Sequence, residues 1–383
     1  MTYTYRILVV DDEPDVEPLV LQRMRRHIRS KEYDFVFAQN GIEALEKLNE
    51  DPTIDMVLSD INMPKMDGLT LLQQLPGVNP NLRAVIISAY GDMDNIRTAM
   101  NRGAFDFVTK PIDFNDLQIT IARTVDHLAE WRSALASRDQ LVALQNELGI
   151  ASQLQQSILP KHTLASSSFE VAAEMEPARN VGGDFYDYFT VEDEIGLVVA
   201  DVSGKGIPAS MFMMSSRTAL KGSAIGVREP EAVLTEVNNQ LHADNPTFMF
   251  VTMVYALFNP NTNTLTYSIA GHDPPLLVKA DGTVRELEST KGVALGVTSN
   301  VEYSQQSVKL DPGDTIFLYT DGVTEAMNAE NEQFGMNRLT ETFNGVTLTT
   351  PDDANQRVLE QVHNFAAGAV QSDDITCLAL RRL

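Results

Sequence analysis

Cysteine is nearly absent from this sequence of 383 residues, and Cys377 is its single instance. One cysteine excludes a disulfide framework and a zinc site made of cysteines. Cys377 lies in an apolar, strand-like run, so we expect it to be a small buried core residue. The six histidines, among them His242 and His272, show no metal-ligand pairing, and the sequence has no Gly-x-Ser-x-Gly motif. No pattern therefore predicts a serine, cysteine or histidine nucleophile.

Basic residues are also scarce, because 29 lysines and arginines stand against 53 acidic residues, for a formal net charge of -24. This charge argues against non-specific binding to nucleic acid or to an anionic membrane surface. No uninterrupted apolar run is long enough to span a bilayer. The first residues meet acidic side chains straight after a short apolar run, unlike a signal peptide. We therefore expect a soluble cytoplasmic protein with neither a nucleic-acid nor a membrane partner.

The sequence does contain acidic motifs in two different sets, one toward each end of the chain. The first set is Asp11-Asp12, Asp60, Ser88 and Lys110, and the second is Gly182-Gly183-Asp184, Asp201-Val202-Ser203-Gly204-Lys205-Gly206, Asp321-Gly322 and Asp373-Asp374. Carboxylates gathered at the ends of strand-like runs bind hard divalent cations and handle phosphoryl groups. The pattern predicts two phosphate chemistries in one protein.

Strand and helix signals alternate over residues 1–125. Short apolar runs occur at residues 7–10, 35–38, 56–58, 84–87 and 105–108. This alternation predicts βαβ units and a parallel sheet, in a doubly wound, flavodoxin-like α/β domain. Ligands of such sheets bind beyond the carboxyl ends of the strands, where the first acidic set falls.

A helical linker is predicted over residues 126–160, where strand signals stop and Gly149 is the only glycine. Its apolar residues recur mostly three, four or seven positions apart, as in a coiled coil, with one register slip near Arg138. Pro160 ends the helix. We expect the apolar face to pair with a second copy in a homodimer; packing back onto the chain's own domains is the alternative. Gly149 and the register slip near Arg138 are either points where the helix switches between two conformations or irregularities without a function.

A mixed α+β domain is predicted over residues 161–383. Its strand-like runs include residues 169–174, 195–201, 250–258, 264–270, 275–278 and 315–319, with turn signals between them, and helices are expected at 208–224, 231–241 and 352–366. The second acidic set lies on separate strand ends of this domain. Carboxylates so placed could converge on two divalent cations, which activate water for an in-line attack at phosphorus.

The N-terminal acids suit phosphoryl transfer to a carboxylate. Adjacent aspartates and a third on a neighbouring strand end can hold one Mg²⁺, leaving Asp60 as a nucleophile toward a phosphoryl donor. Lys110 could neutralise one phosphoryl oxygen, and Ser88 could donate a hydrogen bond to another. The whole segment resembles a response-regulator receiver domain, through Leu8-Val9-Val10-Asp11-Asp12-Glu13, Ser59-Asp60-Ile61-Asn62-Met63-Pro64, Met66-Asp67-Gly68, Ile87-Ser88-Ala89, Gly103-Ala104-Phe105-Asp106-Phe107 and Thr109-Lys110-Pro111.

The receiver resemblance implies that a sensor histidine kinase phosphorylates Asp60. Ser88 and Phe107 would then be the pair that rearranges. The implied Mg²⁺ ligands are Asp12, Asp60 and the carbonyl of Asn62, with Asp11 in support.

The C-terminal motifs resemble the PP2C-like, or PPM, superfamily of metal-dependent Ser/Thr protein phosphatases. The closest branch is bacterial and acts in stress and sporulation sigma-factor pathways. The stretches that carry the resemblance are Gln155-Gln156-Ser157-Ile158-Leu159-Pro160, Val181-Gly182-Gly183-Asp184-Phe185-Tyr186-Asp187, residues 201–206, Ala270-Gly271-His272, residues 318–325 and Asp373-Asp374-Ile375-Thr376. The fold implied is two packed β-sheets flanked by helices.

This second resemblance implies a site for two Mg²⁺ or Mn²⁺ ions. Asp201 would bridge both, helped by the carbonyl of Val202. Asp321 and Asp373 would complete one ion, Asp184 would hold a water on the other, and Asp374 is a less favoured ligand than Asp373. Arg179 stands where relatives outside this branch carry a phosphate-binding arginine. The implied substrate is a phosphorylated anti-sigma-factor antagonist with a STAS-type fold.

Two other interpretations of the C-terminal domain fit its motifs less well. Gly182-Gly183-Asp184-Phe185 is superficially like the signature of diguanylate cyclases, but it lacks a second acid before the phenylalanine. A phosphatase-like adaptor that has lost its metals should have substituted the key acids, all of which are present here. The sequence thus predicts a response regulator in which phosphorylation of Asp60 controls an enzyme that dephosphorylates phosphoserine or phosphothreonine on a partner protein.

Overall fold

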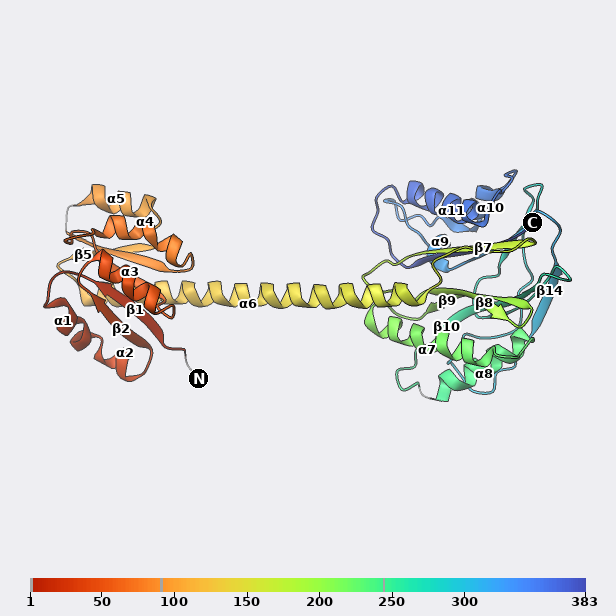
Figure 1. Ribbon diagram of the computed structural model, residues 1–383, viewed down its shortest axis with the longest axis horizontal. Coiled ribbons are helices and arrows are strands. Elements are labelled where there is room, and N and C mark those ends of the chain that lie inside the picture. Colours follow the sequence, from red (N-terminus) through yellow and green to blue (C-terminus); the bar gives the residue numbers. More distant parts are fainter. Residues whose placement is uncertain (1–2, 90–91, 244) are drawn as a thin grey trace. The chain divides into compact units, whose positions relative to one another are not determined.

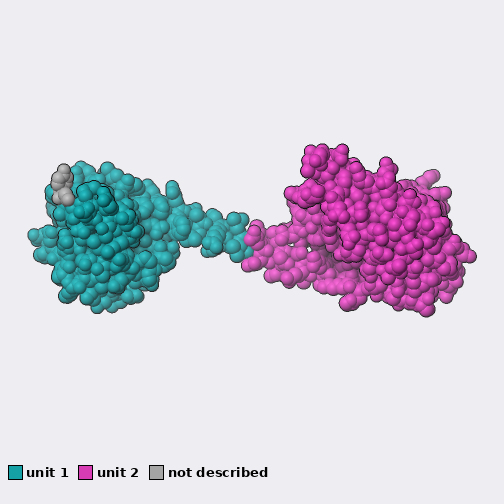
Figure 2. Space-filling model, turned by 90° about the horizontal axis from the view of Figure 1, so that it is seen from above, with its two compact units in different colours: residues 1–143 teal, residues 144–383 magenta. Residues whose placement is uncertain are grey.

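A computed structural model describes residues 3–89, 92–243 and 245–383. The chain divides into two compact units, residues 1–143 and 144–383 (Figure 2). The division falls inside one 45-residue helix, α6 (Phe114–Ile158), which contributes to both units (Figure 1). No helix among the described residues combines the length and the apolar character needed to cross a membrane.

The first unit contains a five-stranded parallel sheet in the order β2-β1-β3-β4-β5, which confirms the predicted doubly wound domain. Its strands and helices are β1 (Tyr5–Val10), α1 (Val16–Arg23), α2 (Arg25–Arg29), β2 (Tyr33–Ala38), α3 (Gly41–Glu50), β3 (Met56–Asp60), α4 (Gly68–Val78), β4 (Arg83–Ala89), α5 (Met93–Asn101) and β5 (Asp106–Lys110). A separate apolar core lies on each face of the sheet, so the central strands are apolar almost throughout. The carboxyl ends of β1, β3 and β5 carry the acids and the lysine of the first set.

Helix α6 begins as part of the first unit. Its residues Leu117, Ile121, Val125 and Leu128 lie at helical spacing and are buried in the same core as β1 and β3. Trp131 on the next turn is half exposed, and its indole N–H donates to Asn81 Oδ1 at 3.3 Å. The helix runs through Gly149 without interruption.

The second unit contains two β-sheets, in the orders β14-β11-β10-β9-β8 and β13-β12-β15-β16-β7-β6. Its elements are β6 (Leu164–Ala165), β7 (Phe169–Glu176), β8 (Phe185–Val191), β9 (Glu194–Val202), α7 (Ile207–Ser223), α8 (Pro230–Ala243), β10 (Val251–Asn259), β11 (Thr264–Ala270), β12 (Leu276–Val278), β13 (Val284–Glu286), β14 (Gln305–Lys309), β15 (Thr315–Tyr319), α9 (Asp321–Thr324), α10 (Gly335–Phe343), α11 (Pro351–Ala366) and β16 (Ile375–Arg382). Helices α7 and α8 cover one sheet, and α10 and α11 cover the other (Figure 1). The predicted packed sheets with flanking helices are confirmed.

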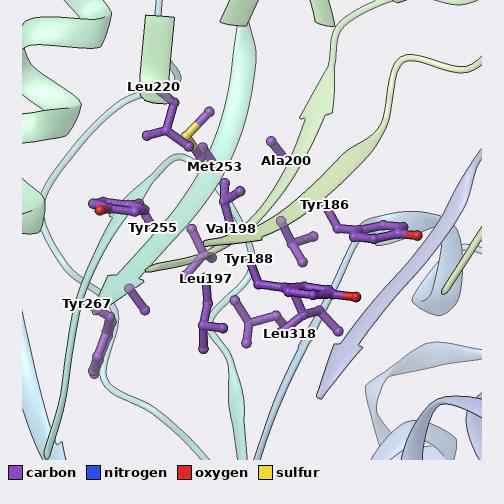
Figure 3. Close-up of a cluster of buried hydrophobic side chains, with 14 of the residues drawn as sticks. Tyr186, Tyr188, Leu197, Val198, Ala200, Leu220, Met253, Tyr255, Tyr267 and Leu318 are labelled. Carbon is purple, nitrogen blue, oxygen red and sulfur yellow. The ribbon is translucent and has the colours of Figure 1, made fainter. Parts of the chain in front are cut away.

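Alternation along β15 shows how the layers are joined. Ile316 and Leu318 belong to the core between the sheets, whereas Phe317 and Tyr319 belong to the core under α10 and α11. Successive strand residues point to opposite faces, so one buried strand serves both cores. Figure 3 shows Leu318 in the first of these cores, among side chains from β8 to β11.

Strand β8 was not among the strands expected from the sequence. Its residues are mainly aromatic and polar, which hides the aliphatic signal of a buried strand. Tyr186 and Tyr188 are nevertheless buried there, because their hydroxyls donate to the carbonyls of Pro160 at 2.9 Å and of His162 at 2.6 Å. This strand directly follows Asp184 and therefore places part of the candidate site.

Candidate functional site

The acids of the receiver lie close enough together to hold one cation. One ligand oxygen from each of Asp11, Asp12 and Asp60 lies within 4.8 Å of the others, with Asp11 and Asp60 buried and Asp12 exposed. Asn62 follows on the exposed loop after β3. A hard divalent cation needs one or two carboxylates and otherwise keeps its water, so these residues fit the predicted Mg²⁺.

Lys110 occupies the same cluster from the end of β5. Its ammonium lies 2.8 Å from Asp60 Oδ2, 3.0 Å from Asp11 Oδ2 and 2.9 Å from Glu13 Oε1. Burial acts to lower the pKa of Lys110, but the hydrogen bonds to these three carboxylates outweigh burial and raise it. Burial has the opposite effect on the carboxyl of Asp11, whose pKa it raises. Glu13, which the sequence did not single out, is thus a third partner of the lysine.

Ser88 and Phe107, the predicted switch pair, lie on the neighbouring strands β4 and β5. Ser88 is fully buried, and its hydroxyl has no hydrogen-bond partner among the described residues. Phe107 is 36% exposed. A buried hydroxyl without a hydrogen-bond partner costs stability. Ser88 can therefore move to a new acceptor without breaking an existing hydrogen bond.

Loops of the second unit meet around the buried carboxylate of Asp374. Its Oδ1 accepts the N–H of Ala178 at 2.8 Å, and its Oδ2 accepts those of Gly183 at 2.6 Å and Asp184 at 3.3 Å. A Cβ on Gly182 would lie 2.4 Å from Asp374 Oδ2, which leaves room only for glycine. Both oxygens of Asp374 are therefore engaged in holding the loop.

Asp184 is placed by this loop and is only 1% exposed. Its Oδ2 accepts hydrogen bonds from the hydroxyls of Thr320 at 2.7 Å and Thr376 at 2.8 Å, residues at the adjoining ends of β15 and β16. Burial, and then the negative charges of Asp201 and Asp374, raise the pKa of Asp184 well above its usual range. The two threonines lie inside quoted motifs, but their role could not be read from the sequence.

Asp201 and Asp321 also lie in an electrostatically crowded place. Burial raises the pKa of Asp201; a hydrogen bond with Asp184 opposes this, and the charge of Asp373 adds to it. Burial, and then the charge of Asp201, raise the pKa of Asp321 to about 7. A divalent cation relieves the repulsion between neighbouring carboxylates, so this set of oxygen ligands fits the predicted metals.

Asp373 lies on the open side of the same site. Its carboxylate is 33% exposed, and Lys205 from the loop after β9 approaches its Oδ2 to 2.8 Å. Across the described ranges, the receiver trio is the one group of three potential ligands that lie within 4.8 Å of one another. The ligand oxygens of the second acidic set therefore lie farther apart than those of the receiver trio. Arg179 is exposed on the loop five residues before Asp184.

The comparisons with known proteins match each unit separately. Residues 7–122 match the model of the response regulator receiver domain. Residues 192–383, half of the chain, match the model of stage II sporulation protein E, or SpoIIE. The chain belongs to the SpoIIE family. It joins a receiver domain to a domain of the PP2C type, as its motifs indicated.

Individual relatives agree with this membership. The chain is 33% identical over 213 residues to phosphoserine phosphatase RsbU of Bacillus subtilis, covering 55% of this chain and 63% of RsbU. It is 31% identical over 268 residues to protein IcfG of Synechocystis, covering 62% of this chain and 41% of IcfG. The chain thus spans less than two thirds of either relative. The solved PP2C domain of SiaA from Pseudomonas aeruginosa aligns with a TM-score of 0.55 at 25% identity, over 63% of this chain and 98% of that domain.

Proposed function

We propose that this chain is a metal-dependent phosphatase, controlled by its receiver, that removes phosphate from phosphoserine or phosphothreonine on a partner protein. The observation that carries the proposal is that the charge of Asp201 acts on both Asp184 and Asp321 in a SpoIIE-type domain, where burial and the neighbouring carboxylates raise their pKa values. A divalent cation bound among these carboxylates would relieve the mutual repulsion that helps to raise their pKa values.

The residues proposed to hold two Mg²⁺ or Mn²⁺ ions are Asp201 with the Val202 carbonyl, Asp321, Asp373 and, through water, Asp184. Asp374 is better suited to holding the loop, since both its oxygens accept backbone N–H groups. Bound cations would acidify water and neutralise charge on the phosphate. In the reaction, a water oxygen bonds to phosphorus in line, the bond from phosphorus to the serine oxygen breaks, and the leaving oxygen takes up a proton.

Control is proposed to begin at Asp60. A sensor histidine kinase would transfer a phosphoryl group to this carboxylate, and the new oxygens would attract Lys110 and the unpartnered hydroxyl of Ser88. Movement of Ser88, with Phe107, would change the packing of the receiver. Helix α6 takes part in the cores of both units, so it is the element able to carry that change.

Two partners are proposed besides the kinase. The likeness to a phosphoserine phosphatase supports a phosphorylated protein substrate, for which we propose an anti-sigma-factor antagonist of STAS-type fold. A second copy of the chain is proposed as the partner of α6. The central part of this helix leaves Leu141 and Leu144, which lie three positions apart on one face, 61% and 50% exposed. Such a face is stabilised when a second helix covers it.

The deciding experiment measures phosphate release from a phosphoserine protein with Mg²⁺ or Mn²⁺, with and without beryllofluoride as a phosphoryl mimic at Asp60. Wild type should release phosphate only with metal, and Asp201→Asn should abolish release. Glu360→Gln is the matched control, because it neutralises an exposed acid on α11. A rate that changes with beryllofluoride supports receiver control. No release from folded wild type under any condition would overturn the enzyme proposal in favour of a phosphatase-like adaptor.

A further inference from the structure

The turn between β9 and α7 carries a lysine, Lys205, whose side chain reaches the acids of the second set. Its ammonium lies 2.8 Å from Oδ2 of Asp373 and also donates to the carbonyl of Ser372. Among the described residues, Lys205 is the only basic side chain in an ion pair with an acid of that set. It therefore supplies positive charge at a site that is otherwise built from carboxylates.

The charge of Lys205 also acts on the residue proposed to bridge the two cations. Burial raises the pKa of Asp201, and the positive charge of Lys205 acts in the opposite direction. Asp201 and Asp373 are both proposed cation ligands, so the ammonium lies beside the place where the phosphate of a substrate would meet the cations. A phosphate brings negative charge among these carboxylates, and a nearby ammonium offsets part of the repulsion.

The ammonium of Lys205 can take a further partner. A lysine carries three N–H donors on a flexible stem of four carbons. The contacts with Asp373 and Ser372 occupy two of the three donors, and the side chain of Lys205 is 38% exposed. The third donor can therefore bind an oxygen of an incoming phosphate while the turn keeps its conformation.

The turn leaves open space on both sides of Lys205. The flanking glycines, Gly204 and Gly206, have φ values of +90° and +75°, a conformation that favours glycine. A Cβ added to either glycine would meet no other part of the described chain within 4 Å. The backbone around the lysine is thus uncovered, which a site that admits a phosphorylated segment of another protein requires.

Arg179 is the other basic residue that could bind the phosphate. It lies on the exposed loop five residues before Asp184. Among the described residues, no ion pair joins Arg179 to an acid of the second set, whereas Lys205 contacts Asp373 directly. The position of the two side chains in the fold therefore favours the lysine.

We propose that Lys205 binds the phosphate of the substrate, and that Asp373 holds the ammonium in place while the site is empty. When Asp373 serves as a cation ligand, its oxygens are less available to the ammonium, which then turns to the phosphate oxygens. The inference rests on the proposed function and names a substrate-binding residue of the same site. Lys205 is thus a competitor of the cations for Asp373 and a partner of the phosphate, and its removal has opposite effects on the two binding steps.

The test titrates the full-length chain by calorimetry, first with Mn²⁺ and then, in saturating Mn²⁺, with inorganic phosphate. Lys205→Met removes the charge and keeps most of the stem. It should bind Mn²⁺ severalfold more tightly, and phosphate about tenfold more weakly, the effect of losing one charge-assisted hydrogen bond. Lys205→Arg keeps the charge and should bind phosphate nearly as wild type does. The receiver is unchanged in these variants, so the differences report on the second unit.

Two control variants separate Lys205 from other positive charges. Lys309→Met removes an exposed lysine on β14 and should match wild type in both titrations. Arg179→Met should bind phosphate as wild type does. With a phosphoserine protein as substrate, Lys205→Met should raise KM more than it lowers kcat, because the lysine already contacts the phosphate before the reaction.

Three results would overturn the role of Lys205. The first is unchanged phosphate affinity in Lys205→Met, and a loss confined to Arg179→Met would assign the phosphate to the arginine instead. The second is weaker binding of both Mn²⁺ and phosphate by Lys205→Met without recovery in Lys205→Arg, which would show that the lysine only holds the turn. The third is a wild-type protein that binds no phosphate in saturating Mn²⁺.

Failure of the enzyme proposal is a separate result. A wild-type protein whose phosphate binding depends on Lys205, but which releases no phosphate from phosphoserine proteins, would overturn the enzyme proposal alone. Normal phosphate release, together with wild-type KM and phosphate affinity in Lys205→Met, would overturn the role of Lys205 alone.

Discussion

The ammonium of Lys110 lies 2.8 Å from Oδ2 of Asp60. This contact sets a competition, because a positive side chain and a divalent cation would share the oxygens of the same carboxylates. Replacing Lys110 by Met should therefore strengthen Mg²⁺ binding to the receiver, and it should weaken the response to beryllofluoride, which loses a counter-charge. Calorimetric titration of both variants with Mg²⁺ measures the first effect. Lys31→Met, on an exposed turn, is the control; equal Mg²⁺ affinity in all three proteins would contradict the competition.

Asp373 and Asp374 should give opposite results when changed to asparagine. Asp374→Asn replaces one acceptor oxygen by an NH₂ group facing backbone donors, so it should lower the free energy of unfolding by about 1–3 kcal/mol. Asp373→Asn should leave stability nearly unchanged and weaken metal binding, because this side chain is partly exposed. Urea unfolding of the metal-free proteins separates the two. The assignment is wrong if Asp373→Asn is the less stable variant.

Trp131 is the single tryptophan and reports on the contact of α6 with the receiver. Its indole donates to Asn81, and the guanidinium of Arg83 lies 5.7 Å from its ring centroid. Loading Asp60 with beryllofluoride should shift the emission maximum if α6 repacks. Asp60→Asn, which cannot carry the mimic, should show no shift. An unchanged spectrum in a wild-type receiver proven to be loaded would count against α6 as the moving element.

The contribution of Asp321 to the stability of the metal-free protein should fall as pH rises from about 4 to about 7. The pKa of Asp321 is raised to about 7 in the fold from an ordinary 3.8, so the folded state binds more protons than the unfolded state in that window. Stability contributed by protonated Asp321 is then lost as the pH increases. Denaturation in chelator at several pH values should show a shallower decline for Asp321→Asn, with Glu360→Gln behaving as wild type. Parallel curves for all three would show that Asp321 titrates normally.

Much of the fold followed from short-range patterns. The parallel sheet and the positions of Asp11, Asp60 and Lys110 at strand ends were predicted, because a strand followed by a polar residue is visible locally. Strand β8 was missed, since its tyrosines are buried only by virtue of carbonyls more than twenty residues away. The buried hydrogen bond from Gln155 near the end of α6 to the carbonyl of Gly182 was not predicted for the same reason, since the two residues are 27 positions apart.

The amino-acid sequence by itself determined which residue types stand at which strand ends, and so the two acidic sets and the family to which they belong. The resemblance favoured Asp373 over Asp374 as a metal ligand, but residue type alone gives no physical reason for the difference, because the two are adjacent and chemically identical. Tertiary structure made them different. Neighbouring residues at the start of a strand point in opposite directions, so Asp374 turns into the loops and is buried by backbone N–H groups, while Asp373 turns toward Lys205 and solvent.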